Sequence, residues 1–149
     1  MKNQIREKII RLLSYRMRSK RELELLLLNK GHNKRDIDEN INYLELKGYL
    51  DDNLFTKMYA KHLVEYKLLG RISVLNKFRT HRIEVSIINE VLDDLYIKNK
   101  PADLIEKNVN KKFNCNSNDF KCRAKIASHL QRKGFSYDDI NSYFHSIEP

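Results

Sequence analysis

The stretch LQRKGFSYDDI at residues 130–140 has a counterpart in LLNKGHNKRDI at residues 27–37. In each stretch a leucine precedes a lysine and a glycine, and an isoleucine follows the glycine at the same distance. Midway between the two lies FRTHRIEVSII at residues 78–88, where Arg82 takes the place of glycine. The sequence therefore predicts three copies of one structural unit.

The apolar residues around these joints follow helical spacing. After each joint they recur at i, i+4 and i+7, which places them on one face of an α-helix: Ile37, Ile41 and Leu44; Ile88, Leu92 and Leu95; Ile140, Phe144 and Ile147. Before each joint they recur at i and i+4: Leu23 and Leu27; Val74 and Phe78; Ile126 and Leu130. Each unit therefore contains at least two amphipathic helices.

A further helix is expected to open each unit, near residues 3–15, 53–67 and 102–113. Its buried positions are predicted to be Ile5, Ile9, Leu12 and Leu13; Leu54, Met58, Leu63 and Val64; Leu104, Ile105, Val109 and Phe113. The predicted fold is all-α, with three tandem three-helix repeats at residues 1–50, 51–99 and 100–149 forming an elongated, curved array. The competing architecture is a compact globule of eight or nine helices.

Glycine, proline and capping residues fall at the predicted boundaries. Gly31 and Gly134 follow second helices, where glycine adopts a left-handed conformation without a Cβ penalty. Gly48 is expected to end the first repeat and Gly70 to end the opening helix of the second repeat. Arg82 must either adopt that costly left-handed conformation or end its helix in another way.

Helix starts are also marked. Ser19, with Glu22 three residues later, has the pattern of a capping box. Asp51 or Asp52 is expected to cap the next helix, and Ser136 to cap the last helix. Pro101 stands at the first position of a helix, which proline favours.

The composition excludes a transmembrane protein. The chain has 149 residues, 33% of them charged, and it contains no apolar run long enough to span a bilayer. The N-terminus lacks the apolar core of a signal peptide, so we expect a cytoplasmic protein with no membrane contact. In that compartment the two cysteines, Cys115 and Cys122, are expected to be reduced thiols.

The net charge is +9, which favours binding to nucleic acid, an anionic membrane or an acidic protein surface. Bases concentrate in the first two helices of a repeat: between residues 57 and 82 the only acid is Glu65, whereas residues 83–96 contain acids and no base. Regular stacking would align these helices into a basic stripe. The alternative is that the charges only solvate the surface.

The candidate residues for binding a partner or DNA are the bases of this stripe. Their expected role is long-range attraction and charge-assisted hydrogen bonding to carboxylate or phosphate groups. They are Arg16, Arg18, Lys20, Arg21, Lys61, Lys67, Arg71, Lys77, Arg79, Arg82, Lys125 and Arg132.

Several tyrosines lie near bases or at helix ends: Tyr15, Tyr49, Tyr59, Tyr66 and Tyr137. An exposed aromatic ring beside a base can stack on an unpaired nucleobase or anchor a protein interface. The alternative is that these rings lie at the edge of the core with the hydroxyl in water.

Motifs for catalysis are lacking. The sequence has no HExxH, GxSxG, GxGxxG or P-loop pattern, so we expect no catalytic residue and no cofactor. Cys115, Cys122 and His129 recur at intervals of seven residues, whereas zinc ligands are usually paired two to four residues apart. We therefore expect no metal site.

Three segments resemble the RecX family of recombination regulators. They are LLSYRMRSKREL at 12–23, GYLDDNLF at 48–55 and LQRKGFSYDDI at 130–140, in the order found in that family. Met17 stands where the family commonly has proline, His32 replaces an apolar residue, and Arg82 replaces a glycine. The resemblance covers nearly the whole chain and agrees with the three-repeat plan.

The resemblance implies a function. Members of this family bind the RecA recombinase, typically as a filament on single-stranded DNA, and inhibit or modulate its ATPase and strand-exchange activities in recombination, DNA repair and the SOS response. They are not enzymes. The expected partners are therefore a RecA filament and DNA, single-stranded or also double-stranded, and the protein is expected to be a monomer. The alternative is a basic helical-repeat module that binds nucleic acid without a recombinase.

Overall fold

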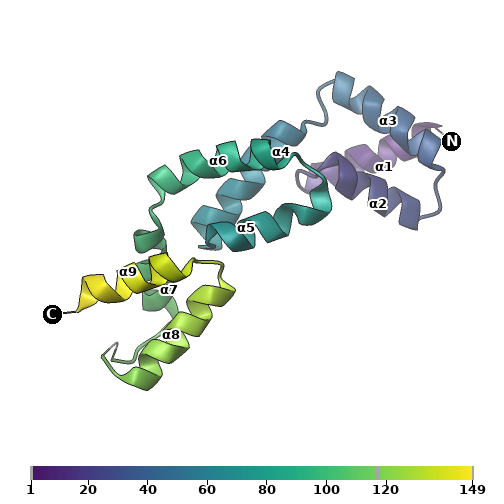
Figure 1. The fold of residues 1–149 in the computed structure, drawn as a ribbon. Helices are drawn as coiled ribbons and strands as arrows, with labels where there is room; N and C mark the ends of the chain where they lie inside the picture. Colours follow the sequence, from purple (N-terminus) through teal and green to yellow (C-terminus); the bar gives the residue numbers. More distant parts are fainter. Residues whose placement is uncertain (1, 117, 149) are drawn as a thin grey trace. The chain divides into compact units, whose positions relative to one another are not determined.

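The computed structural model describes residues 2–116 and 118–148. Met1 and Pro149, the outer ends of the first and third predicted repeats, lie outside the described residues. Within the described part the chain is helical and has no strand, so the predicted all-α class is confirmed (Figure 1). In the same part, no helix combines the length and the apolar character needed to cross a membrane.

The helices follow the predicted three-by-three order. The first repeat holds α1 (Lys2–Tyr15), α2 (Lys20–Asn29) and α3 (Lys34–Leu46). The second holds α4 (Asp52–Lys61), a π-helical turn η1 (His62–Tyr66), α5 (Arg71–Phe78), a 3₁₀ turn η2 (Arg79–His81) and α6 (Val85–Lys98). The third holds α7 (Pro101–Lys112), α8 (Phe120–Arg132) and α9 (Tyr137–Ile147).

The helices belong to two compact units. Unit 1 comprises residues 1–58 and 78–84, and unit 2 comprises residues 59–77 and 85–149. The second repeat thus contributes residues to both units. The three repeat boundaries and the elongated, curved form of the array stay predictions.

Unit 1 has a core of aliphatic side chains on the inner faces of its first three helices. Helices α1 and α2 both pack against α3, which the i, i+4 spacing of their apolar residues makes possible. The buried residues are Ile5, Ile9, Leu23, Leu27, Ile37, Ile41, Leu44 and Leu50, with Leu12 and Leu13 packed at the edge. Full burial of one such side chain stabilises the fold by about 1.5–3 kcal/mol.

Unit 2 buries the corresponding faces of α5 to α9. Helices α7, α8 and α9 contact one another. The buried residues include Val74, Ile88, Leu92, Leu104, Ile105, Val109, Ile126, Leu130, Phe135, Ile140 and Phe144. All but one of these, Phe135, stand at positions that the helical spacing predicts.

The predicted inner face of α4 is wrong. Leu54 and Met58 are 48% and 53% exposed, whereas Phe55, Thr56 and Ala60 are buried. Thr56 and Ala60 have the i, i+4 spacing of one face, but neither is a large apolar residue, so the pattern of large side chains pointed to the neighbouring face. The Thr56 hydroxyl donates to the carbonyl of Asp52 at 2.7 Å, which satisfies it inside the core.

A similar correction applies to the end of α9. Ile147 is 37% exposed, although its spacing from Ile140 and Phe144 predicted burial. Leu95 and Phe113 are half-buried rather than buried. Each of the three is the last residue of its predicted face.

The predicted caps Ser19 and Ser136 are confirmed, but only the Ser19 half of the capping box is seen, because the Glu22 carboxylate pairs with Arg16 and Arg18. Ser19 Oγ accepts from the Glu22 N–H at 3.1 Å, and Ser136 Oγ accepts from the Asp139 N–H at 3.1 Å. Pro101 is the first residue of α7. These caps satisfy backbone donors that a helix start otherwise leaves unpaired.

The two candidate caps of α4 have different partners. Asp51 Oδ1 accepts from the N–H groups of Asn53 and Leu54, so Asp51 is the cap. Asp52 Oδ1 accepts instead from the backbone N–H of Lys20 at 2.9 Å, and it thereby ties α4 to the start of α2 within unit 1.

The joints after the second helices are left-handed, as predicted. Gly31 has φ 87° and Gly134 has φ 94°. At the middle joint α5 first tightens into the 3₁₀ turn η2, and Arg82 then adopts φ 51° and ψ 43°. A residue with a Cβ pays about 1–2 kcal/mol for this conformation, so the middle joint is strained where the other two are not.

Gly70 does not end the opening helix of the second repeat, contrary to the prediction. That helix ends through the π-helical turn η1, in which the Lys67 N–H reaches the His62 carbonyl at 3.1 Å, and Leu68 takes the left-handed conformation with φ 58°. Gly70 is instead required for close packing, because a Cβ there would collide with the backbone oxygen of Gly134.

The prediction that the two cysteines are reduced thiols is wrong. Cys115 and Cys122 form a disulfide, with their Cα atoms 6.0 Å apart, and no free cysteine remains in the described residues. The turn between α7 and α8 brings the two residues within the usual Cα separation of a disulfide. The prediction of reduced thiols came only from the expected compartment, and that argument says nothing about how close the two residues lie.

Candidate functional site

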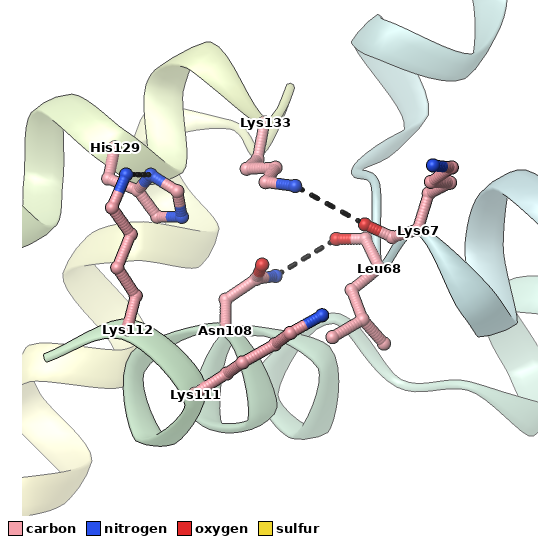
Figure 2. A pocket seen from close by; sticks show the side chains of 7 residues that line it. All are labelled: Lys67, Leu68, Asn108, Lys111, Lys112, His129 and Lys133. Carbon is pink, nitrogen blue, oxygen red and sulfur yellow. Dashed lines mark hydrogen bonds between the residues drawn. The ribbon is translucent and has the colours of Figure 1, made fainter.

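The candidate site is a basic pocket in unit 2, at the C-terminal ends of α7 and α8 (Figure 2). Its volume is about 320 Å³, within the range of ligand-binding sites. We call it the lysine pocket; it is lined by Lys67, Leu68, Asn108, Lys111, Lys112, His129 and Lys133. None of these lining residues, all within the described part of the chain, is acidic.

Three segments supply the lining. Helix α7 presents Asn108, Lys111 and Lys112 on successive positions of one face, whereas α8 contributes His129 and its C-cap Lys133. The short segment after η1 contributes Lys67 and Leu68. Lysines at the last turn of a helix are favoured there, because the helix dipole places partial negative charge at that end.

Backbone contacts hold these segments together. Asn108 Nδ2 donates to the Leu68 carbonyl at 2.9 Å and to the Leu104 carbonyl at 3.0 Å, so a nearly buried amide fixes the left-handed turn against α7. The Gly70 N–H donates to the Lys133 carbonyl at 2.8 Å. Together these bonds hold Lys67 and Lys133 on facing sides of the pocket.

The ammonium groups in the pocket crowd one another. Burial lowers the pKa of Lys133 below its ordinary value, and the positive charges of Lys111, Lys112 and Lys67 lower it further. Nζ of Lys133 has a carbonyl neighbour, that of Lys67, at 3.5 Å. The pocket therefore concentrates positive charge and would gain from an anion that lies among these groups.

His129 forms the inner wall. It is 8% exposed, its ring packs edge-on against Phe113 with 5.5 Å between centroids, and its Nδ1 lies 3.4 Å from Nζ of Lys112. Burial lowers its pKa, and Lys112, Lys133 and Arg132 lower it further. A neutral ring with Nδ1 as acceptor suits the Lys112 contact.

A second hollow adjoins the pocket and shares Lys112 with it. Its volume is about 380 Å³. It is lined by Lys112, Phe113, Ala124, Lys125, Ser128 and Arg132. Basic residues of α7 and α8 therefore form one surface across the two hollows.

Three of the predicted binding residues belong to this surface: Lys67 lines the lysine pocket, and Lys125 and Arg132 line the second hollow. Four others are exposed elsewhere, Lys61 and Lys77 in unit 2 and Arg79 and Arg82 in unit 1. Among the described residues none of these seven makes an ion pair, so each is available to a ligand.

The remaining predicted residues contact acids of their own unit. Arg16 and Arg18 pair with Glu22, Lys20 pairs with Glu45 at 2.8 Å, and Arg21 pairs with Glu24 at 3.0 Å. The hydrogen bond to Glu45 raises the pKa of Lys20. In unit 2, Arg71 pairs with Asp93 at 2.8 Å and donates to Asn89 Oδ1 at 3.0 Å. A partner would have to compete with these contacts, and a binding role for these five residues stays a prediction.

Sequence reasoning missed Asn108, Lys111, Lys112, His129 and Lys133. The available signal was the pair Lys111–Lys112 at the end of one helix and Lys133 at the end of the next. Whether these two helix ends meet depends on how α7 and α8 cross, and only the tertiary contacts show that they do and that Lys67 joins them.

Chemically, the surface offers ammonium groups and one buried imidazole to a ligand that carries several acceptor oxygens. Phosphate and carboxylate groups meet that requirement. The described residues contain no cluster of histidine, cysteine and acidic side chains that could hold a metal ion.

The chain is similar to proteins of one family. The family models for the first and third three-helix domains of RecX match residues 6–44 and 102–144. A relative named Regulatory protein RecX from Vibrio campbellii is 33% identical over 96% of this chain and 90% of its own length. The one from Bacillus subtilis is 31% identical over 91% of this chain, which spans 52% of that longer relative.

Solved structures show the same fold. The crystal structure of RecX from Lactobacillus salivarius aligns with a TM-score of 0.76 over 98% of this chain and 96% of its own, at 24% identity. A second one, described as regulatory protein RecX, aligns with a TM-score of 0.77 over 95% of this chain at 20% identity. From the match to relatives along nearly its entire length, this chain belongs to the RecX family of regulatory proteins.

Proposed function

We propose that the protein binds a RecA recombinase filament on DNA and inhibits its ATP hydrolysis and strand exchange. The observation that carries the proposal is the 33% identity to a regulatory protein over 90% of that protein's length. The basic surface of unit 2 supports it, because a filament on DNA offers both phosphate groups and acidic protein side chains. The proposed role is regulatory and not catalytic.

The proposal extends to partners and location. A protein that acts on recombination and the SOS response works where the chromosome is, in the cytoplasm of a bacterial cell. It acts as a monomer on the filament, and DNA in the complex is mainly single-stranded. The twelve basic residues predicted from the sequence remain the proposed contacts, foremost Lys67, Lys125 and Arg132.

The test is a titration of the cognate recombinase during DNA-dependent ATP hydrolysis. Substoichiometric protein should slow hydrolysis, because one molecule on a filament affects more than one protomer. Unchanged hydrolysis at every ratio, in moderate salt, would refute the proposal.

A charge-reversed variant locates the contact. Lys67→Glu/Lys125→Glu/Arg132→Glu should weaken inhibition, because these side chains make no ion pair among the described residues and their reversal breaks none. The matched control is Lys98→Glu/Lys107→Glu/Lys121→Glu, which reverses three exposed lysines of the same unit outside both hollows. Arg71 is unsuited to this test because its ion pair with Asp93 would become a repulsion.

The lysine pocket also favours a second candidate, a nucleic-acid-binding module without a recombinase partner. Its mark would be salt-dependent binding to naked DNA together with no effect on ATP hydrolysis by the recombinase. Undetectable binding to naked DNA at physiological ionic strength would exclude it and leave the recombinase as the partner.

A further inference from the structure

The exposed ring of Tyr66 lies beside Lys67, one of the residues that line the lysine pocket. Tyr66 ends η1 and immediately precedes Lys67, whose Nζ lies 5.8 Å from the centroid of the tyrosine ring. The residue is 71% exposed. Its ring stacks on the His62 ring with 5.2 Å between centroids and 18° between planes, so an aromatic platform and a cluster of ammonium groups share one short stretch of surface.

The backbone that carries this platform is strained. Two residues after the π-helical turn, Leu68 occupies the left-handed region at a cost of about 1–2 kcal/mol. π-helical turns and strained residues are concentrated at functional sites, where the strain holds a side chain in place. Here the strained segment sets Tyr66 and Lys67 at the edge of the pocket, and the bond from Asn108 fixes it there.

The chemistry of the pocket selects a phosphate. Lys111 and Lys112 extend from α7 and Lys133 from α8, so donors arrive from two helices, while Lys67 turns its carbonyl toward Lys133 (Figure 2). A backbone phosphate has two charged oxygens and two ester oxygens arranged around phosphorus as a tetrahedron, whereas a carboxylate presents two oxygens in one plane. The positive charge that the four lysines hold together is reduced when such an anion lies among them.

The exposed aromatic ring of Tyr66 favours a ligand that carries an unpaired nucleobase. An aromatic ring that stacks on a nucleobase contributes about 1–3 kcal/mol, whatever the base. An acidic side chain of a protein gains nothing comparable from the ring. The combination of phosphate-binding lysines and a stacking ring is therefore typical of a site for single-stranded nucleic acid.

We propose that the lysine pocket binds a backbone phosphate of single-stranded DNA while the ring of Tyr66 stacks on a neighbouring base. In a duplex the bases are already paired and stacked, so only the phosphate contact remains. The inference rests on the proposed function, since DNA is part of the filament to be regulated, and it adds to that function a defined site and a preference for single strands.

The test measures binding of the full chain to a fluorescent oligothymidylate and to a duplex of the same length, without recombinase, by anisotropy at several salt concentrations. Lys112→Gln/Lys133→Gln should lower the affinity for both by about tenfold or more and reduce the salt dependence for the single strand by about one contact or more. The control Lys107→Gln/Lys121→Gln removes the same charge from the same two helices outside the pocket, and should change affinity by less than about twofold.

Substitutions of Tyr66 test the proposed stacking on a base separately. Tyr66→Leu should weaken binding to the single strand by about fivefold or more and leave duplex binding unchanged, whereas Tyr66→Phe should retain the wild-type affinity. Circular dichroism and thermal unfolding check that each variant is folded. If Lys133→Gln unfolds the chain, Lys111→Gln/Lys112→Gln, which changes two exposed residues of the pocket, replaces it.

Three outcomes of these measurements would overturn the inference. Wild-type affinity for the oligonucleotide in the pocket variant excludes DNA from the pocket. Inorganic phosphate that protects the wild type from thermal unfolding but does not compete with the oligonucleotide identifies a site for free phosphate instead. Normal DNA binding with lost ATPase inhibition in that variant identifies an acidic protein surface.

Failure of the inference is distinguishable from failure of the proposed function. If the pocket variant binds the oligonucleotide as the wild type does while the wild type still slows ATP hydrolysis, only the inference falls. If the wild type never slows hydrolysis, the proposed function falls whatever the result of the anisotropy measurement.

Discussion

The backbone N–H of Gly70 donates a hydrogen bond of 2.8 Å to the carbonyl of Lys133. This bond joins the segment after the π-helical turn to the end of α8, and the Ile72 N–H reinforces it by donating to the Gly134 carbonyl at 3.2 Å. Because Lys67 and Lys133 line one pocket, the contact between the two glycines sets the spacing of its charges.

The glycine contact can be tested by adding one methyl group. Gly134→Ala should destabilise the protein by several kcal/mol, because the new Cβ collides with Ser73 in addition to the left-handed strain. Gly31→Ala is the matched control: it has the same backbone conformation with nothing within 4 Å, so it should cost only about 1–2 kcal/mol. Urea unfolding of both variants gives the comparison, and equal losses would show that the contact contributes nothing.

The middle joint offers a stabilising change. Arg82→Gly should raise the free energy of unfolding by about 1 kcal/mol, because glycine occupies the left-handed region without a Cβ penalty. Arg79→Gly, within the right-handed turn just before it, should instead lower stability by about 0.5–1 kcal/mol. Chemical denaturation distinguishes the two, and a loss at Arg82 would contradict the assigned backbone conformation.

The contact between Ser19 and His81 predicts a pH dependence. Ser19 Oγ lies 2.6 Å from His81 Nδ1, and burial lowers the pKa of His81 below its ordinary value of 6.5. A proton therefore binds the unfolded chain more tightly than the folded one. The stability contributed by neutral His81 should be complete above about pH 6.5 and be lost as the pH falls toward the lower folded-state pKa.

Thermal unfolding across that range tests this dependence. His81→Gln should flatten part of the curve below pH 6.5; the rest should remain, because the pKa of His129 is lowered as well. His145→Gln is the control, since that residue is exposed on α9. An unchanged curve in His81→Gln would show that the residue titrates alike in both states.

The disulfide predicts a response to reductant. Opening the Cys115–Cys122 loop should lower the free energy of unfolding by about 2 kcal/mol, because the short cross-link restricts the unfolded chain. Cys115→Ser should unfold at the same temperature with and without reductant. A wild type that is indifferent to reductant would show that the bond contributes no stability.

Much of the fold follows from local signals. Ser19, Ser136 and Pro101 start helices as their residue types predict, and Gly31 and Gly134 end them, because caps and left-handed turns depend on a few neighbouring atoms. Burial on α4 did not follow, since Thr56 and Ala60 carry little hydrophobic signal although they face the core. A small side chain is buried when a neighbouring helix lies close, which is a tertiary property.

The site was predictable only in part. The excess of bases indicated the kind of ligand, and Lys67 was among the residues named. Lys133 was not, because its place opposite Lys67 depends on the contact at Gly70, which joins segments far apart in the sequence. For the same reason the sequence could not show that Arg71 is held by Asp93.

The crowding of ammonium groups around Lys133 gives dissolved salt two opposite effects on this protein. Mobile ions shorten the range of charge interactions to about 8–10 Å near physiological strength, and so they relieve the repulsion that the folded chain stores in the pocket. The same ions compete with any phosphate that would enter it. A high salt concentration should therefore stabilise the folded chain and weaken its binding to polyanions. A low salt concentration should destabilise the folded chain and strengthen that binding.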